Sequence, residues 1–309
     1  GGDCRRLSSL KSSERYMLKE YYYRVAGQVF CLCVPPEQDI DLLLPSFRPF
    51  RCERPGEEEV LFKFIALTCF FQAAEVVTVL EEAKNEWGCT RIVQTAHGFQ
   101  IECQCGKSEV THGLRANPPF TLVTAVIHWN ERHAGEILSL LLRLVYSQAI
   151  LYRNGIALHA SVVALDGKGY LFMGNSGTGK STHASLWIGL FPGCELLNDD
   201  NPVVRIEEEG VMVYGTPWSG KTACYRNQRF PVRGIVRLVQ APHNRFIRQE
   251  EVDAFITVLP GCAVFPQAES LHKKLCDTLI ALTGRVPVGV LECLPNREAA
   301  QLCKSGIES

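Results

Sequence analysis

Tyr170-Leu-Phe-Met-Gly-Asn-Ser-Gly-Thr-Gly-Lys-Ser181 is the stretch of sequence that decides the fold. Its first four residues form an apolar run that predicts a β-strand, and residues 180–190 predict a helix. Between them, residues 174–181 match the phosphate-binding pattern G-x-x-x-x-G-K-S. A glycine loop between a strand and a helix binds phosphates because its backbone N–H groups and the helix N-terminus converge on one anion. The stretch therefore predicts a nucleotide site.

Each part of this loop has an expected role in binding Mg²⁺ and ATP. The glycines let the backbone turn with its N–H groups inward, Lys180 bridges the terminal phosphates, and Ser181 is a ligand of Mg²⁺. The expected nucleotide-binding residues are Gly174, Asn175, Ser176, Gly177, Thr178, Gly179, Lys180, Ser181 and Thr182.

A second stretch, Gly215-Thr-Pro-Trp-Ser-Gly-Lys-Thr222, matches the same pattern. Pro217 has no N–H group, so it removes a donor from any phosphate cradle. Trp218 adds bulk where the backbone would close around phosphate, and no apolar helical pattern follows Lys221. We therefore assign the nucleotide to the first loop. The second is either an ordinary loop or one that brings Lys221 to the phosphates or the acceptor as a catalytic residue.

Asp199 and Asp200 are the candidate carboxylates for metal binding and proton transfer. They follow the predicted strand 195–198, and neighbouring strand residues point to opposite sides. Both are expected to act as catalytic residues and, with Ser181, as metal ligands. A base would accept a proton from the acceptor hydroxyl, and the sequence leaves open which aspartate does so. The alternative is an ordinary turn, since Asp-Asp-Asn-Pro has typical turn composition.

His159 is a further catalytic candidate. It lies in the predicted strand 156–165, which the turn 166–169 joins to the strand before the glycine loop. The two strands are expected to pair as a hairpin, which would bring His159 near the loop. The alternative is a histidine of the core. Four arginines are candidates for neutralising charge during phosphate transfer: Arg226, Arg229, Arg233 and Arg245.

The pattern of predicted elements changes near residue 129. Residues 1–128 read as short strands separated by turns, which predicts a mainly antiparallel, β-rich domain. Residues 132–152 have apolar residues at helical spacing, and strands alternate with helices after them. We expect a smaller N-terminal β-rich domain (1–128) and a nucleotide-binding domain (129–309).

Composition excludes several classes of protein. The chain has 309 residues, 32 Lys and Arg against 33 Asp and Glu, and 46% hydrophobic residues. A net charge of -1 gives no footprint for non-specific nucleic-acid binding, and the apolar fraction is that of a globular protein. Arg143 interrupts the apolar run 137–150, so no membrane span is expected. The basic N-terminal segment lacks the apolar core of a signal peptide, which favours a cytoplasmic protein.

The 14 cysteines are scattered along the chain rather than packed into a short secreted domain. This spacing favours a reducing compartment and cysteines used as small apolar residues. Two pairs, Cys31-x-Cys33 and Cys103-x-Cys105, each place both thiols on one face of a strand. Packing explains such pairs, whereas zinc sites normally use wider spacing.

Residues 155–222 resemble the catalytic domain of HPr kinase/phosphorylase and, more distantly, phosphoenolpyruvate carboxykinase. In that superfamily a histidine-bearing strand, a strand entering a glycine loop, and an Asp-Asp pair follow in this order. The resemblance implies an α/β (α+β) P-loop kinase core, Mg-ATP, and a base acting on an acceptor hydroxyl beside His159. It also implies a homo-oligomer. The layout of the whole chain looks like bacterial HPr kinase-like proteins.

The chain departs from this family at two positions. Thr182 follows Gly-Lys-Ser where HPr kinases carry Glu, and the second family signature is only echoed by residues 232–237. The expected function is Mg-dependent transfer of the ATP γ-phosphate to a hydroxyl of a small metabolite or a protein serine. The alternatives are HPr serine kinase/phosphorylase itself, a non-catalytic ATP-binding module, and a carboxykinase. The sequence does not name the acceptor.

Overall fold

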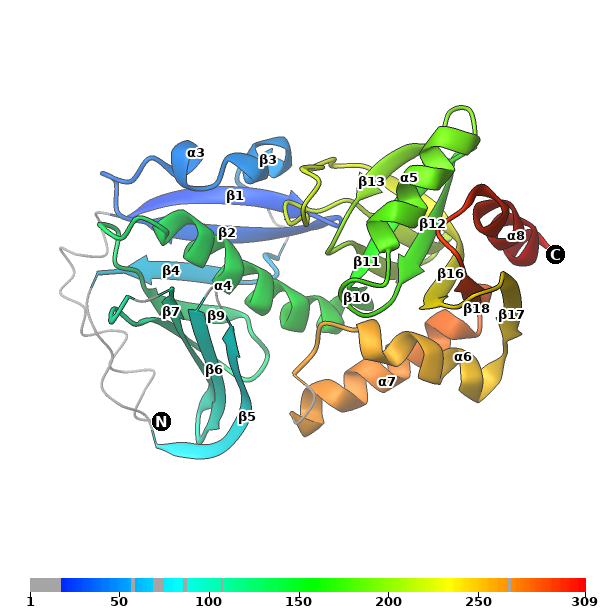
Figure 1. Ribbon diagram of the computed structural model, residues 1–309. Coiled ribbons are helices and arrows are strands. Elements are labelled where there is room, and N and C mark those ends of the chain that lie inside the picture. The colour runs from blue at the N-terminus through cyan, green and yellow to red at the C-terminus, as the bar shows by residue number, and fades with distance from the viewer. Residues whose placement is uncertain (1–17, 57–58, 69–74, 86–87, 107, 266–267) are drawn as a thin grey trace. The chain divides into compact units, whose positions relative to one another are not determined.

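The computed structural model describes residues 18–56, 59–68, 75–85, 88–106, 108–265 and 268–309. It is a mixed α/β protein with two nine-stranded sheets and few helices (Figure 1). The N-terminal segment on which the signal-peptide expectation rests lies outside these residues. The chain divides into two compact units, residues 1–24 with 28–145 and residues 25–27 with 146–309. This division falls inside a helix that begins at Ala134, rather than at residue 129, where the sequence pattern changes.

The first unit contains one mixed sheet. Its order is β3-β1-β2-β4-β9-β8-β7-β6-β5, and β4 runs parallel to both β2 and β9. The expectation of a mainly antiparallel sheet therefore holds for β5 to β9 but not around β4. A parallel neighbour needs a crossover, and α3 (Ile40–Leu43) and η2 (Pro45–Phe50) supply it between β2 and β4. The strands are β1 (Lys19–Val25), β2 (Gln28–Val34), β3 (Arg51–Cys52), β4 (Lys63–Leu67), β5 (Val76–Asn85), β6 (Gly88–Thr95), β7 (Gly98–Cys105), β8 (His112–Ala116) and β9 (Leu122–Val126).

Aromatic rings form the core of the first unit. Phe30 stacks on Phe62 with 4.8 Å between ring centroids, and Tyr23 lies 5.5 Å from both Phe30 and Phe47. All four side chains are at most 1% exposed. Such rings bury large apolar areas, and their stacked and edge contacts add stability to that burial.

The second unit contains a sheet of order β10-β14-β15-β16-β12-β11-β13, with β18 beside β16 and β17 beside β18. The expected hairpin of β11 and β12 is present, and β14 and β15 form a second hairpin. The strands are β10 (Gly155–Ala157), β11 (Ala160–Leu165), β12 (Lys168–Met173), β13 (Glu195–Asn198), β14 (Val203–Glu207), β15 (Gly210–Tyr214), β16 (Arg229–Gln240), β17 (Arg245–Gln249) and β18 (Val288–Cys293). The helices are η3 (Ile150–Arg153), α5 (Lys180–Leu190), α6 (Glu251–Val258), η4 (Leu259–Gly261), α7 (Glu269–Thr283) and α8 (Arg297–Glu308).

Helix α5 packs against β11 and β12 and against α8 (Figure 1). Trp187 of α5 is fully buried and contacts Tyr170 and Phe172 of β12, at 4.8 and 5.2 Å between ring centroids. The same core includes Cys303 of α8. This packing fixes the helix that follows the glycine loop, so the loop is held between two buried elements.

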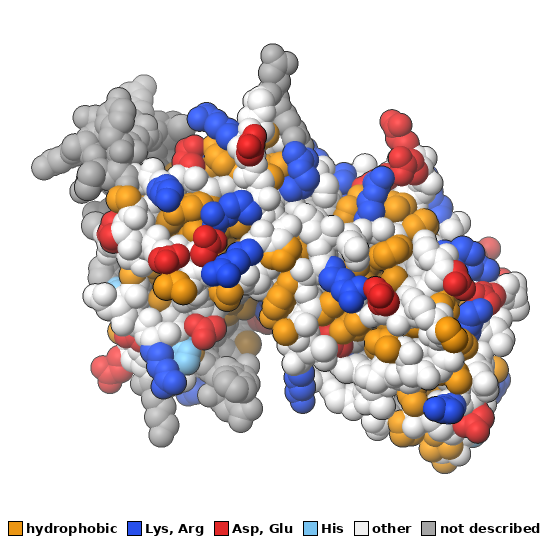
Figure 2. All heavy atoms as spheres, turned by 90° about the horizontal axis from the view of Figure 1, so that it is seen from above, with side chains coloured by type: hydrophobic (Ala, Val, Ile, Leu, Met, Phe, Trp, Pro, Cys, Tyr) orange, Lys and Arg blue, Asp and Glu red, His pale blue; other side chains and the backbone are white. Residues whose placement is uncertain are grey.

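One helical segment, Ala134–Arg153, is long and apolar enough to cross a membrane by length and composition. It comprises α4 (Ala134–Ala149) and η3. Within the structure 67% of its most apolar window is buried, as in the core helix of a folded domain. Figure 2 shows basic and acidic side chains interspersed among hydrophobic ones on the face that it draws.

The predicted strand 156–165 is wrong in one respect, because two strands occupy it. β10 ends at Ala157 and β11 begins at Ala160, with a bend at His159 between them. The N–H of Leu158 donates to the carbonyl of Pro202, and that of His159 donates to the carbonyl of Gly261. These two backbone bonds turn the chain out of the sheet, so His159 lies at a strand junction rather than within a strand.

Candidate functional site

The glycine loop has a backbone that only glycines adopt readily. Gly174, Gly177 and Gly179 have φ angles of 153°, 82° and 97°. A Cβ at Gly174 would lie 2.4 Å from Oγ1 of Thr178, so a larger residue would not fit there. The loop is closed by Thr178, whose N–H and hydroxyl both donate to the carbonyl of Asn175. The sequence thus specifies a preformed turn at the end of β12.

Lys180 is the first residue of α5, and it lies over the loop. Its ammonium donates to the carbonyls of Gly174 and Asn175, at 2.9 and 3.2 Å. The residue is 8% exposed, and burial lowers the pKa of its side chain, while the charges of Asp200 and Asp199 act in the opposite direction. The first turn of α5 holds no acidic residue of its own, so its N–H groups are not capped by a carboxylate from the helix.

Sheet topology gathers three segments at one edge. β11 lies between β12 and β13 and is antiparallel to both. Ala160 pairs with Met173, and Val162 pairs with Asn198, so β11 begins where its two neighbours end. Ser161, the glycine loop and Asp199 therefore meet at this edge.

Asp199 is the centre of that meeting point and is only 5% exposed. Its Oδ1 accepts hydrogen bonds from Oγ of Ser181 at 2.9 Å and from Oγ of Ser161 at 2.8 Å. Its Oδ2 accepts one from the N–H of Thr222 at 3.3 Å. A serine hydroxyl and a carboxylate oxygen at the end of the glycine loop are the hard oxygen ligands that Mg²⁺ prefers. The residues present therefore fit a magnesium ion.

Asp200 faces a different partner. Its Oδ1 lies 3.0 Å from Nδ1 of His159, and the two side chains are 29% and 46% exposed. The N–H of Ala160 donates to the backbone carbonyl of Asp200, which ties this residue to the start of β11. The two adjacent aspartates thus have separate environments, one buried against the loop and one open to solvent beside a histidine.

Asn198 shapes the turn that separates these aspartates. Its side chain is fully buried, and its Oδ1 accepts from the N–H groups of Asp200 and Asn201, at 3.0 and 2.8 Å. Its Nδ2 donates to the carbonyl of Trp218 at 2.9 Å. The side-chain amide of Asn198 therefore holds both the turn that contains the two aspartates and the second glycine loop. The stretch is a turn, as its composition predicted, and this turn also positions the two carboxylates.

The second glycine loop packs against the aspartates. No helix follows it, as the sequence predicted. A Cβ at Gly220 would lie 3.2 Å from the carbonyl oxygen of Asp199 and 3.3 Å from Cβ of Asp200. Trp218 is 7% exposed and lies 5.3 Å from Tyr146 between ring centroids. The large side chain of Trp218, which makes this loop unsuited to binding phosphate, therefore anchors the loop in the core.

The remaining candidates have other surroundings. Lys221 is exposed on the second loop, and Thr182 is exposed in the first turn of α5. Two of the candidate arginines form ion pairs: Arg226 with Glu195 at 2.6 Å and Arg229 with Glu207 at 2.8 Å. A guanidinium of Arg233 donates to the carbonyl of Glu308, and Arg245 lies on β17. Arg226, Arg229 and Arg233 therefore each contact another part of the fold.

The sequence missed two polar residues that hold the site. Ser161 follows His159 by two residues, and its hydroxyl holds the carboxylate of Asp199. Asn198 directly precedes the two aspartates. The only signal in the sequence was that both are polar residues at one end of an apolar strand. A buried polar side chain at such a position needs a hydrogen-bond partner.

Comparisons with known proteins give little further information. No family model and no curated protein matches the sequence. Among solved structures, the HPr(Ser) kinase/phosphatase from Coxiella burnetii aligns with 49% of this chain and 88% of its own, at 16% identity and a TM-score of 0.31. At that score the likeness carries no argument about activity. The functional interpretation therefore depends on the geometry of the loop and the aspartates.

Proposed function

We propose that the protein is a Mg²⁺-dependent phosphotransferase that moves the γ-phosphate of ATP to a hydroxyl of a small metabolite or a protein serine. The observation that carries the proposal is the 2.9 Å contact between Oγ of Ser181 and Oδ1 of Asp199. It joins the end of the glycine loop to a buried carboxylate, and these are the two protein ligands that P-loop enzymes give to Mg²⁺.

The fit to magnesium rests on how the two oxygens are held. Ser161 donates to the same Oδ1 atom, and the N–H of Thr222 donates to Oδ2, so the carboxylate of Asp199 is oriented before any ion binds. Ser181 and Asp199 would hold the ion. A bound Mg²⁺ supplies neutralisation of the negative charge that gathers on the phosphates.

The fit to ATP rests on the glycine loop and on Lys180. The loop and the N-terminus of α5 offer backbone N–H groups to the phosphates. We infer that the ammonium of Lys180 contacts a phosphate oxygen when ATP binds, because it has three N–H donors and the carbonyls of Gly174 and Asn175 take two of them. Burial of this lysine strengthens its interaction with a phosphate, because the local dielectric is low.

Asp200 is our candidate for the general base. The acceptor oxygen forms a bond to the γ-phosphorus, the bond from that phosphorus to the bridging oxygen of ADP breaks, and the acceptor proton passes to Asp200. Its partly exposed carboxylate leaves room for an acceptor, and His159, whose Nδ1 lies 3.0 Å from its Oδ1, orients it. Lys221 on the second loop is exposed and free of a structural role in the core, which supports a role in contacting the acceptor.

The experiment that tests this function incubates the protein with Mg²⁺ and γ-labelled ATP in three separate samples, of which the first two come from a cell extract. The first contains the small molecules of the extract, the second its proteins, and the third purified HPr. We expect label to enter one sample with the parent protein and not with Lys180→Met. ATP binding without transfer in every sample would contradict the proposal and favour a non-catalytic ATP-binding module.

A further inference from the structure

The first unit holds a pair of thiols that the proposed phosphotransfer does not use. Cys31 and Cys33 lie on one face of β2, and each is 2% exposed. Their sulfur atoms are 3.7 Å apart, and both cysteines are free thiols. Two sulfur atoms that share a face at this separation are able to bind one ion.

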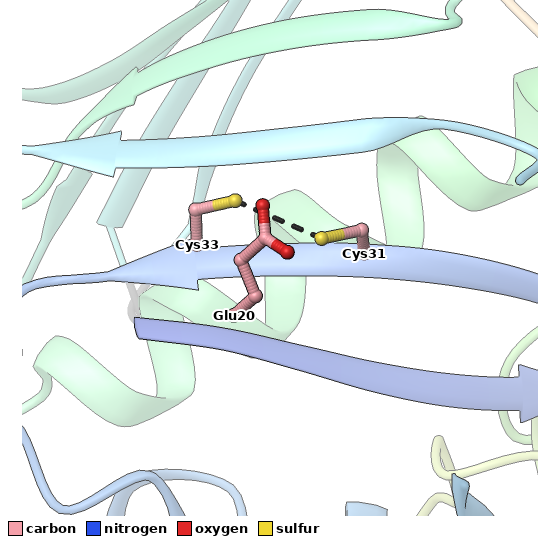
Figure 3. A group of neighbouring side chains, drawn as sticks. All are labelled: Glu20, Cys31 and Cys33. Atoms are coloured by element: carbon pink, nitrogen blue, oxygen red, sulfur yellow. Dashed lines mark hydrogen bonds between the residues drawn. The ribbon is translucent and has the colours of Figure 1, made fainter. Parts of the chain in front are cut away.

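A carboxylate completes a set of three ligand atoms. Glu20 extends from β1, and Figure 3 shows its carboxylate beside the two sulfur atoms of Cys31 and Cys33. All three ligand atoms lie within 4.8 Å of one another. The side chain of Glu20 is 33% exposed, so an ion has a route from solvent to the buried thiols.

We propose that Glu20, Cys31 and Cys33 form a zinc site that ties β1 to β2. Two thiolates bound to one tetrahedral zinc at about 2.3 Å lie about 3.8 Å apart, close to the distance between these thiols. The carboxylate favours zinc over monovalent copper, because copper in that state selects soft sulfur ligands alone. Three protein ligands leave the fourth position of the ion to water.

The charges of the ion and of a neighbouring lysine balance those of the three ligands. Two thiolates and one carboxylate carry three negative charges, and a zinc ion carries two positive charges. Lys63 supplies the third, because its ammonium lies 2.6 Å from Oε1 of Glu20 and it pairs with Cys31 across β4 and β2. The filled site is therefore neutral, which reduces the cost of burying it.

Two hydrogen bonds prepare the ligands. The hydroxyl of Tyr22 donates to Oε2 of Glu20 at 2.6 Å, which orients the carboxylate as a neighbouring group does at known metal sites. The two thiols also hydrogen-bond to each other, with 3.7 Å between their sulfur atoms, which holds both on the same side of β2. Each thiol that binds the ion does so as a thiolate and releases its proton.

The second C-x-C pair provides a matched control in the same sheet. Cys103 and Cys105 lie on β7, and burial raises the pKa of Cys103 to about 12. No third ligand gathers at this pair among the residues that the structure describes. The two pairs share the C-x-C spacing on a strand, but only the first has a carboxylate within ligand distance, so only the first is assigned to zinc.

The test titrates the reduced, metal-free, full-length protein with Co²⁺, whose thiolate charge-transfer and visible bands report sulfur ligands and tetrahedral geometry. We expect one equivalent to bind with the band strength of two thiolates, and Zn²⁺ to displace it. The double variant Cys31→Ser/Cys33→Ser should lose the band, and Glu20→Gln should bind Co²⁺ at least about tenfold more weakly. Cys103→Ser/Cys105→Ser should match the parent.

Two results would overturn the site. One is a parent titration as weak as that of the Cys31→Ser/Cys33→Ser variant. The other is an unchanged cobalt affinity in Glu20→Gln, which would leave only a thiol pair. Circular dichroism of each metal-free variant shows whether it is folded. If the double serine variant is unfolded, Glu20→Gln, which keeps the size of the side chain, decides the question.

Discussion

Nδ1 of His159 lies 3.0 Å from Oδ1 of Asp200, at the junction where β10 ends and β11 begins. The adjacent residue, Asp199, turns its carboxylate the other way, toward Ser181 at the end of the glycine loop. Two neighbouring carboxylates thus have different partners and different exposure. This separation is the basis for assigning the metal to Asp199 and the proton to Asp200.

The first prediction concerns that proton. Asp200→Asn keeps the size of the side chain but removes the base, so we expect the rate of phosphate transfer to fall by about 10²- to 10⁴-fold. The affinity for Mg-ATP should stay within about twofold, because Asp199 and the loop are intact. Single-turnover transfer of labelled phosphate measures the first quantity, and equilibrium ATP binding measures the second.

Asp166→Asn is the matched control for that variant. Asp166 is an exposed turn residue with a φ of 51°, a conformation that Asn also adopts. It should transfer phosphate as the parent does. Equal transfer rates in Asp200→Asn and the parent would refute the role of Asp200 as base.

The second prediction concerns the contact between the second glycine loop and the aspartates. A methyl group at Gly220 would lie 3.2 Å from the carbonyl oxygen of Asp199, so Gly220→Ala pushes the loop outward. The hydrogen bond from the N–H of Thr222 to Asp199 is then lost. This loss costs about 1 kcal/mol, so we expect Mg-dependent ATP binding to become about fivefold weaker. Gly189→Ala, where nothing lies within 4 Å, is the control. Unchanged affinity in both variants would show that this contact does not orient Asp199.

The third prediction concerns the buried amide of Asn198. Asn198→Ala removes the acceptor of the N–H groups of Asp200 and Asn201, whereas the carbonyl of Trp218 still accepts from Oγ1 of Thr216 at 3.1 Å. Each buried unsatisfied group costs about 1–3 kcal/mol, and we expect the free energy of unfolding to fall by roughly 2–4 kcal/mol in total. Denaturant unfolding measures it. A loss below about 0.5 kcal/mol, as at an ordinary surface position, would contradict the linking role.

The fourth prediction is a pH dependence of stability. Burial lowers the pKa of His183 to about 4 from its ordinary value of 6.5. Between these values the unfolded chain binds a proton that the native protein does not, so stability falls as pH drops from about 6.5 to about 4. The loss is about 3 kcal/mol for this one group. Other titrating groups add their own slopes to the measured profile.

His183→Gln isolates the contribution of that histidine. Gln keeps an acceptor for Nε1 of Trp187, which donates to Nε2 of His183 at 3.0 Å, but it does not titrate. Unfolding free energies measured from pH 7 to 4 should therefore fall less steeply in this variant. His97→Gln, an exposed turn histidine, should follow the parent. Parallel profiles for His183→Gln and the parent would contradict a neutral buried His183.

Local features of the sequence predicted the centre of the second unit. The strand before the glycine loop, the loop itself and the helix over 180–190 are encoded by neighbouring residues, and α5 spans that same range. The hairpin of β11 and β12 also follows from a short turn. These elements depend on residues a few positions apart, which is why periodicity and turn composition detect them.

Contacts between distant segments were beyond such patterns. The bond from Ser161 to Asp199 joins residues 38 positions apart, and that from Thr222 joins residues 23 positions apart. Both depend on the strand order that brings β11 beside β13, and no local pattern records that order. Helix α6 was missed as well, because Val252 and Ile256 are exposed and blur its apolar face.

The most direct test of the account is the affinity for ATP with and without Mg²⁺, measured by calorimetry on the parent and on Asp199→Asn. The 2.9 Å contact between Ser181 and Asp199 predicts that Mg²⁺ tightens ATP binding by at least about tenfold in the parent and by much less in the variant, which keeps its shape but loses the charged ligand. The absence of saturable ATP binding, or an equal effect of Mg²⁺ in both proteins, would contradict a magnesium site at Ser181 and Asp199.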